Sequence, residues 1–315
     1  MTEHFTRPDV AQLLAMLNTL PGPKMHELPP EGARAVYVAS KDMVDLPLGE
    51  LAVVRDLAAP GAAGDIPLRL FDVRSERAPG PVVVFFHGGG FVIGDLDTHA
   101  GFCAEVSRQL DLPVVAVHYR LAPEHPFPAA PEDCEAAARW VATSPDALGR
   151  TVTGLVPMGD SAGGNLAIVT TMALRDVPAA VPVIAQFPIY PTVDKADRYA
   201  SYDLFNQGRV LTKEGMAWFD AAYATTPDDW RGAPLHGNHR DMPPTVVMTA
   251  GLDPLRDQGR AYAAALIAEG VPVIYREAVG NIHGFVTMRK AIPSAQADVA
   301  GALAALKAVI AEAMA

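Results

Sequence analysis

The stretch Gly159-Asp160-Ser161-Ala162-Gly163 decides the fold of this chain. An apolar run over residues 152–158 precedes it, and a helical pattern over residues 162–174 follows it. A G-x-S-x-G sequence between a strand and a helix forms a sharp turn that lifts the serine hydroxyl clear of the sheet, and its glycines leave room for neighbouring backbone. Because glycine-rich loops match this pentapeptide by chance, its meaning depends on whether the chain also supplies a base, an acid and an oxyanion hole.

Strand and helix patterns alternate on both sides of this turn. The strand patterns cover residues 81–86, 112–118, 152–158, 181–187, 245–250 and 271–276. The helical patterns cover residues 8–20, 32–41, 129–142, 162–174, 213–223, 256–269 and 295–313. From residue 81 onward this alternation predicts a mostly parallel sheet with helices on both faces.

Two details refine the predicted sheet. Residues 51–57 and 66–73 alternate between apolar and polar side chains, which predicts an antiparallel pair of edge strands with a connecting loop near Pro60 and Gly61. Pro157 lies in the strand that leads to Ser161, and its missing N–H removes one bond from the ladder. We therefore expect a local irregularity beside Pro157.

Composition and charge narrow the possible functions. The chain has 315 residues, 50% of them hydrophobic, which is enough to bury a core, and no apolar stretch reaches the ~20 residues that span a bilayer. The 36 acidic residues outnumber the 25 basic ones without a basic cluster, so nucleic acid is not an expected partner. Cys103 and Cys134 lack the spacing of a disulfide framework or a metal site, and residues 1–4 do not begin a secretion signal. We expect a soluble cytoplasmic protein with no metal and no stable membrane association.

Candidate catalytic residues follow four of the predicted strands. Ser161 follows one strand directly, and His87-Gly88-Gly89 follows the strand at 81–86. Asp253 comes after the strand at 245–250, and His283 lies in the loop after the strand at 271–276. The carboxyl ends of parallel strands meet at one edge of a sheet, where functional residues gather. The order serine, aspartate, histidine is the one that hydrolases of this architecture use.

Each of these residue types has a defined part in acyl transfer. A serine hydroxyl needs a neutral histidine to accept its proton, and a carboxylate orients that imidazole. We therefore assign Ser161 as the nucleophile, His283 as the base and Asp253 as the acid. The negative oxygen that develops on the substrate needs N–H donors, for which we predict the backbone amides of Gly88, Gly89 and Ala162.

Other acidic and histidine residues could compete for these roles. Asp257 and Glu277 are alternative partners for the histidine, and Asp253 could instead cap the helix that follows it. The remaining histidines have no metal-binding spacing, and we interpret five of them as packing or surface residues: His99, His118, His125, His236 and His239.

With their flanking residues, these motifs resemble the bacterial hormone-sensitive-lipase-like (family IV) esterases of the α/β-hydrolase superfamily. The resemblance runs from about Leu51 to the C-terminus. The matching residues are 87–99, 119–130, 159–165, 253–257 and 282–285, together with Gly208, Leu211, Thr212, Met216, Trp218 and Phe219. The sequence departs from the family pattern at residues 156–158 and at Ala278-Val279, where the pocket or the pH behaviour could differ.

The resemblance implies an α/β-hydrolase fold with an eight-stranded, mostly parallel sheet, and the same catalytic and oxyanion residues. It further implies a catalytic domain of residues 51–193 and 241–315, N-terminal cap helices in residues 1–50 and a cap insertion at 194–240. Phe91, Trp218 and Phe219 are then expected near the wall of an apolar pocket, although plain core packing is an equal alternative. His87 is expected to brace the oxyanion loop.

By the same resemblance, the substrate is a small carboxylic ester with a short acyl chain, and no cofactor is needed. A homodimer could form through the exposed strand near residues 271–276. The triad alone does not separate an esterase from a deacetylase or an amidase, because all three share the tetrahedral intermediate. A receptor that resembles an esterase is disfavoured because His283 is present, and an interfacial lipase is a further alternative.

Overall fold

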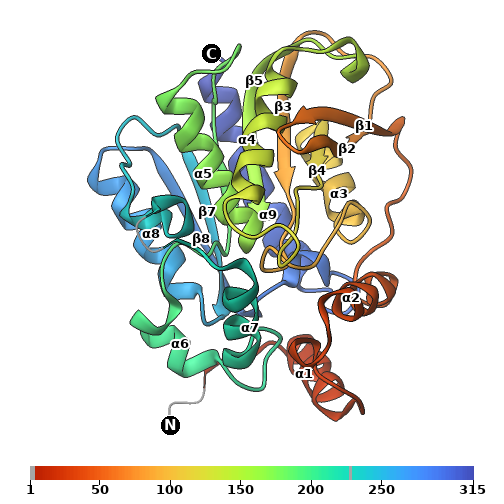
Figure 1. Ribbon diagram of the computed structural model, residues 1–315, viewed down its shortest axis with the longest axis vertical. Coiled ribbons are helices and arrows are strands. Elements are labelled where there is room, and N and C mark those ends of the chain that lie inside the picture. Colours follow the sequence, from red (N-terminus) through yellow and green to blue (C-terminus); the bar gives the residue numbers. More distant parts are fainter. Residues whose placement is uncertain (1–3, 227–228) are drawn as a thin grey trace.

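An eight-stranded sheet in the order β1-β2-β4-β3-β5-β6-β7-β8 forms the centre of the molecule (Figure 1). The structure, a computed structural model, describes residues 4–226 and 229–315, so residues 1–3 of the predicted N-terminal cap and residues 227–228 of the predicted insertion lie outside it. The strands are β1 (Val53–Gly61), β2 (Gly64–Asp72), β3 (Gly80–Phe86), β4 (Val114–Val117), β5 (Val152–Asp160), β6 (Phe187–Ile189), β7 (Thr245–Leu252) and β8 (Val273–Ile282). The pairings from β4 through β8 are parallel, whereas β1 and β2 are antiparallel, which confirms the predicted topology.

The first hairpin is tighter than predicted. β1 continues through Pro60 and Gly61, and Gly61 pairs with Gly64, so the turn consists of residues 62–63 rather than a loop at 60–61. Pro60 is tolerated because β1 is the outermost strand of the sheet, where one side of the backbone needs no partner.

The irregularity expected beside Pro157 lies on the β6 side of β5. Pro157 keeps regular register with Val84 of β3. On the other side, Leu155 pairs with Val183 and Met158 pairs with Phe187, so the neighbouring segment holds one residue more than β5 over this interval. The strand predicted at 181–187 is therefore reduced to the three residues of β6. The missing N–H of Pro157 accounts for the interruption, because the ladder resumes immediately after it.

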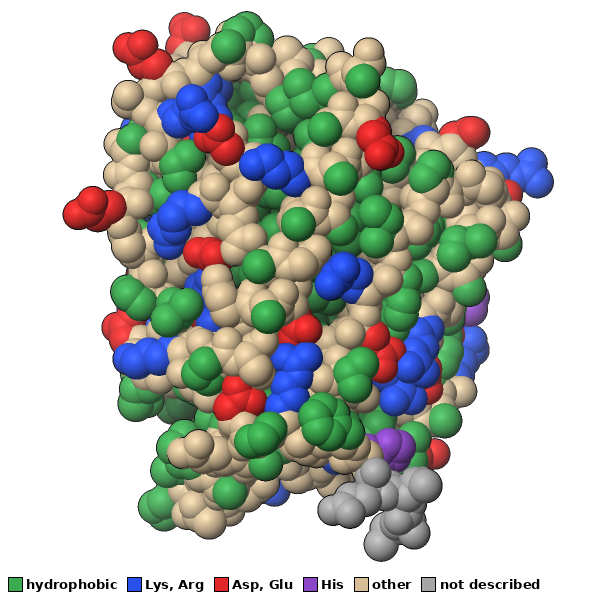
Figure 2. Space-filling model, turned by 180° about the vertical axis from the view of Figure 1, so that it is seen from behind, with side chains coloured by type: hydrophobic (Ala, Val, Ile, Leu, Met, Phe, Trp, Pro, Cys, Tyr) green, Lys and Arg blue, Asp and Glu red, His purple; other side chains and the backbone are tan. Residues whose placement is uncertain are grey.

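Helices cover both faces of the sheet. The α-helices of the described residues are α1 (Pro8–Thr19), α2 (Pro30–Val44), α3 (Ala100–Leu110), α4 (Ala129–Ala142), α5 (Ala162–Asp176), α6 (Ala200–Phe205), α7 (Lys213–Tyr223), α8 (Arg256–Ala268) and α9 (Ala295–Ala313). α3 and α9 pack with one face in one hydrophobic cluster, and α4 and α5 pack with the other face in a second. α8 contacts β7 and β8 and shares a third cluster with α5. Figure 2 shows acidic and basic side chains interspersed over the rear surface.

α1, α2, α6 and α7 gather beyond the carboxyl ends of the parallel strands (Figure 1). α7 begins where the Thr212 side chain accepts a hydrogen bond from the Gly215 amide, a helix-capping contact. Asn18 of α1 donates to the carbonyl of Gly208, which ties the N-terminal segment to the 194–240 segment at 3.2 Å. Arg34 of α2 donates to the carbonyl of Val92 at 2.8 Å, so this group of helices is also fastened to the loop after β3. In the described part of the chain, no helix has the length and apolar character to cross a membrane.

Candidate active site

The turn between β5 and α5 holds Ser161 in a backbone conformation that side chains rarely adopt. Its φ is 57° and its ψ is −116°. Such a conformation costs on the order of 1–3 kcal/mol and persists only where the surroundings impose it. A Cβ at Gly163 would overlap the Phe86 carbonyl, and one at Gly159 would come within 2.5 Å of the same oxygen. The two glycines therefore allow the turn to press against the end of β3, which leaves the partly exposed Ser161 at the start of α5.

Ser161, His283 and Asp253 form a continuous hydrogen-bonded relay. His283 Nε2 lies 2.9 Å from Ser161 Oγ, and His283 Nδ1 lies 2.7 Å from Asp253 Oδ2. Asp253 is fully buried, and its other oxygen accepts the Leu255 amide at 2.8 Å. Since the buried carboxylate can only accept, His283 must carry its proton on Nδ1 and present Nε2 to the serine hydroxyl. This is the geometry that a general base requires.

The strand register explains why the acid and the base meet. Leu252 at the end of β7 pairs with Ile282 at the end of β8, after a register shift that begins at Ala250. Asp253 and His283 are the residues that follow this pair. β8 is longer than the predicted strand at 271–276, so His283 follows the strand end directly instead of lying in a long loop.

The competing acids are engaged elsewhere. Asp257 accepts hydrogen bonds from Arg256 and Arg260, at 2.8 and 3.1 Å. Glu277 accepts from Arg260 at 2.6 Å and from the Tyr275 hydroxyl at 2.8 Å. The hydrogen bonds of His283 thus single out Asp253.

The loop after β3 corrects one predicted oxyanion donor. The Gly88 amide donates to Asp160 Oδ1 at 2.8 Å, so its N–H is already committed and does not point to a substrate. Within the described residues, the amides of Gly89, Gly90 and Ala162 donate to no protein acceptor. Gly89 and Gly90 are partly exposed and have φ values of 114° and 58°. The third glycine of the run, Gly90, is therefore a candidate donor that the sequence reasoning missed.

His87 supports this loop from behind. Its Nδ1 contacts the Gly88 carbonyl at 2.8 Å, and the Tyr119 hydroxyl donates to the His87 carbonyl at 2.7 Å. The two rings stack with centroids 4.3 Å apart. Burial, together with His99 and His118, holds the pKa of His87 well below the ordinary histidine value. A neutral, buried His87 fits the predicted bracing role.

Acidification from about pH 7 to about pH 5 is expected to lower the free energy of unfolding, because His87 stays neutral in the folded state. An unfolded histidine has a pKa near 6.5, so below this pH the unfolded chain binds a proton that the folded chain does not. The loss is about 1.4 kcal/mol per pH unit for such a group, until the folded pKa is reached. Urea unfolding at several pH values measures this slope. His87→Asn should give a shallower slope, and equal slopes for both proteins would contradict the assignment.

The predicted pocket residues divide into two kinds. Phe91 is buried and stacks on Tyr223 of α7 with ring centroids 3.7 Å apart, so it packs in the core. Trp218 and Phe219 are partly exposed and contact each other edge to face. A Cβ on Gly90 would overlap the Phe219 ring, which places Phe219 directly against the oxyanion loop.

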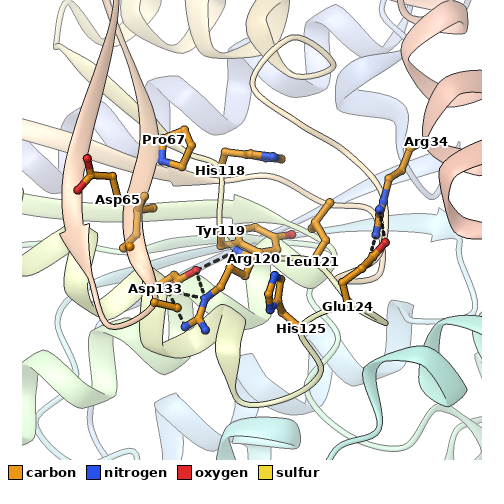
Figure 3. A pocket seen from close by; sticks show the side chains of 13 residues that line it. Arg34, Asp65, Pro67, His118, Tyr119, Arg120, Leu121, Glu124, His125 and Asp133 are labelled. Atoms are coloured by element: carbon orange, nitrogen blue, oxygen red, sulfur yellow. Dashed lines mark hydrogen bonds and ion pairs between the residues drawn. The ribbon is translucent and has the colours of Figure 1, made fainter.

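A cavity of about 430 Å³ lies between the β1–β2 hairpin and the segment after β4 (Figure 3). His118 and Tyr119 line it. Four of its charged side chains form ion pairs, Arg34 with Glu124 and Arg120 with Asp133, whereas Asp65 is exposed at the start of β2. Because Ser161, Asp253 and His283 are all absent from its lining, this cavity is not the site of the chemistry.

The structure therefore unites most of the predicted site. It brings Ser161, Asp253 and His283 together and leaves the backbone amides of Gly89 and Ala162 without a protein acceptor among the described residues. The amide of Gly88 instead donates to Asp160. The structure also adds Asp160 and Tyr190, which adjoin the catalytic residues and carried no separate signal in the sequence. In the described ranges, no group of three or more histidine, cysteine, aspartate or glutamate side chains is arranged to hold a metal ion.

Comparison with known proteins identifies the family. A family model described as alpha/beta hydrolase fold matches residues 83–287. Esterase LipI from Mycobacterium tuberculosis (strain ATCC 25618 / H37Rv) is 38% identical over 287 residues, which cover 89% of each chain. The chain belongs to the hormone-sensitive-lipase-like esterases of the α/β-hydrolase superfamily.

Two further similar proteins show how far the similarity extends. Ethyl acetate hydrolase from Pseudomonas putida is 34% identical and covers 86% of this chain and 87% of its own length. The crystal structure of a mutant of LAE6, an alpha/beta hydrolase enzyme from the metagenome of Lake Arreo, Spain, aligns with a TM-score of 0.89 at 34% identity, over 96% of this chain and 98% of that one. The family fold thus extends over nearly the whole chain.

Proposed function

We propose that this protein is a serine carboxylesterase that hydrolyses small carboxylic esters with short acyl chains. The observation that carries the proposal is the relay from Asp253 through His283 to Ser161, with spacings of 2.7 and 2.9 Å. The esterases among its relatives support the same reaction class.

In the first half of the proposed reaction, Ser161 Oγ attacks the carbonyl carbon of the ester while His283 Nε2 takes the hydroxyl proton. Asp253 holds the imidazole in place and stabilises its positive charge. The tetrahedral intermediate then collapses, the bond from carbon to the leaving oxygen breaks, and His283 gives its proton to that oxygen. An alcohol leaves, and the acyl group remains on Ser161.

In the second half, water attacks the acyl-enzyme. His283 Nε2 takes a proton from the water, the new tetrahedral intermediate collapses, and Ser161 regains its proton as the carboxylic acid leaves. The donors proposed for the oxyanion are the free amides of Gly89, Gly90 and Ala162. The Ala162 amide also lies at the N-terminus of α5, where the helix dipole favours negative charge.

The cap is proposed to consist of residues 1–50 and 194–240, over a catalytic domain of residues 51–193 and 241–315. Two hydrogen bonds support this division. The bond from Asn18 to Gly208 joins the two cap segments to each other, and the bond from Arg34 to Val92 joins the N-terminal cap segment to the oxyanion loop. In this arrangement Trp218 and Phe219 form part of the pocket wall.

An acyl-chain series is expected to show highest kcat/KM for acetyl and butyryl esters. Phe219 lies against the oxyanion loop, so a long acyl chain must displace it or avoid it. We expect kcat/KM for p-nitrophenyl laurate to be lower by about 10-fold or more, since unfavourable packing of about 1.4 kcal/mol changes a rate by this factor. Purified protein with p-nitrophenyl esters of increasing chain length measures the trend.

The matched anilide of acetate tests the amidase alternative in the same assay. Turnover of p-nitroacetanilide close to that of p-nitrophenyl acetate would contradict an esterase assignment. A rising trend toward insoluble long-chain esters would instead indicate an interfacial lipase.

We also propose a cytoplasmic homodimer. β8 is an edge strand of the sheet, and its Ile274 and Val279 side chains are exposed, which supports pairing with a second copy along this edge. Cys103 and Cys134 are both unpaired and buried, which supports a reducing compartment.

A further inference from the structure

Asp160 is a buried carboxylate that the proposed reaction does not use. It ends β5, immediately before the nucleophile, and is 4% exposed. Among the described residues, no lysine or arginine forms an ion pair with it, and the imidazole of His99 lies beside it, with Nε2 3.2 Å from Oδ1. Burying a carboxylate costs free energy unless hydrogen bonds compensate for the lost water, so the contacts of Asp160 indicate which groups it positions.

The first contact of Asp160 fixes the oxyanion loop. Oδ1 accepts the Gly88 amide at 2.8 Å, across 72 residues of sequence. A Cβ on Gly88 would lie 2.5 Å from Asp160 Oδ2, so the carboxylate and the loop backbone are in close contact. The next two residues, Gly89 and Gly90, carry the free amides. The position of those amides relative to Ser161 is thus set by the residue beside Ser161.

The second contact of Asp160 leads to the base. The Tyr190 hydroxyl donates to Asp160 Oδ2 at 3.4 Å, a longer and weaker contact than the first. The Tyr190 ring lies 4.6 Å from the His283 ring, centroid to centroid. Burial and the charge of Asp160 raise the pKa of Tyr190 well above its ordinary value, so the hydroxyl remains a donor.

Tyr190 is itself held in a strained position. Its φ is 33°, in the left-handed region, and its amide donates to the Met248 carbonyl at 2.6 Å. Backbone strain of this kind persists where the surrounding structure requires a particular side-chain placement. Here the requirement is a ring packed on His283 with its hydroxyl toward Asp160.

We propose that Asp160 is a positioning residue that aligns the oxyanion loop and the base with Ser161, one through each carboxylate oxygen. The inference rests on the proposed serine-esterase mechanism and assigns a role to a residue outside the relay. Asp160 acts through Gly88 and through Tyr190, and it touches neither the substrate nor the reacting atoms. Its effect is expected in kcat, because oxyanion donors act on the transition state and contribute little to ground-state binding.

The test compares Asp160→Ala, Asp160→Asn and Tyr190→Phe in turnover of p-nitrophenyl acetate. Asp160→Ala should lower kcat by about 100-fold with KM within about twofold, since misplacing an oxyanion donor costs on the order of 10²–10³ in kcat. Asp160→Asn should recover most of this loss, because its amide oxygen can still accept from Gly88 and its NH₂ can donate to the Tyr190 oxygen. Tyr190→Phe should lower kcat by a few-fold, in proportion to one weak hydrogen bond.

The matched control is Asp72→Asn. Asp72 is also a fully buried carboxylate, but it binds Arg77 and Arg150 at the opposite end of the sheet. Asp72→Asn should lower the thermal midpoint of unfolding while kcat stays within about twofold of the unsubstituted protein. This control separates an effect of lower stability from an effect of a misplaced oxyanion loop or base. A double variant supplies the last comparison: Tyr190→Phe should have no added effect on kcat in the Asp160→Ala background, because the hydroxyl has already lost its partner.

Three outcomes overturn the proposal: kcat unchanged in a folded Asp160→Ala, kcat as low in Asp160→Asn as in Asp160→Ala, or additive effects of Asp160→Ala and Tyr190→Phe. If Asp160→Ala does not fold, the Asp160→Asn and Tyr190→Phe values still decide: an unchanged kcat in Tyr190→Phe, or a large loss in Asp160→Asn, contradicts the role. Failure of the proposed function itself is distinct, because the unsubstituted protein would then not turn over the ester.

Discussion

Ser161→Ala is expected to abolish ester turnover, with a loss of kcat on the order of 10⁵-fold or more. Alanine has no hydroxyl, so neither the attack nor the acyl-enzyme can form, and the oxyanion donors retain only weak residual catalysis. The fold should remain, because the side chain at this position is partly exposed and only one oxygen is removed. Initial rates with p-nitrophenyl acetate, beside circular dichroism and thermal midpoints, give both results.

A covalent probe makes this prediction independent of turnover. A p-nitrophenyl phosphonate ester should form a bond from phosphorus to Ser161 Oγ with release of p-nitrophenolate, and the added mass should map to the peptide that contains Ser161. The alanine variant should take up none. Undiminished turnover in a folded Ser161→Ala protein would refute the proposed nucleophile.

Asp253→Asn is expected to lower kcat by about 10⁴-fold while KM changes little. The carboxylate that accepts the His283 Nδ1 proton at 2.7 Å would become an amide, which favours the wrong tautomer of the imidazole and does not stabilise its cation. The overall structure should persist, since asparagine has the same shape as aspartate. Steady-state kinetics on the purified variant measure the effect.

Asp257→Asn and Glu277→Gln are the controls for this second prediction. Both carboxylates pair with arginines and contact no member of the relay. Their kcat values should stay within about threefold of the original protein, because neither carboxylate is hydrogen-bonded to His283. A small effect of Asp253→Asn together with a large effect of either control would reassign the acid.

The sequence was sufficient to predict the fold and the relay because both depend on local patterns. Alternating apolar segments define the strands and helices, and α4, α7 and α9 have the predicted bounds. Asp253 and His283 could be paired because each follows a strand of the same parallel sheet. No knowledge of packing was needed for these assignments.

Features that depend on tertiary contacts were harder to predict. Gly88 looked like a free donor, but the carboxylate of Asp160, 72 residues away, takes its N–H. The sequence leaves Phe91 between a pocket wall and core packing, and only the stacking of its ring on Tyr223 favours the core. The strand predicted at 181–187 shrank because Pro157 of the adjacent strand offers no donor at the point of pairing.

The position of β8 at the edge of the sheet makes the activity of this protein depend on an edge strand. His283 follows β8 and Asp253 follows the neighbouring β7, whereas Ser161 follows the interior strand β5. Edge segments open in smaller cooperative units than the interior of a sheet. We therefore expect partial unfolding of this edge to abolish activity while most of the secondary structure persists, so that inactivation on warming should precede the melting of the fold.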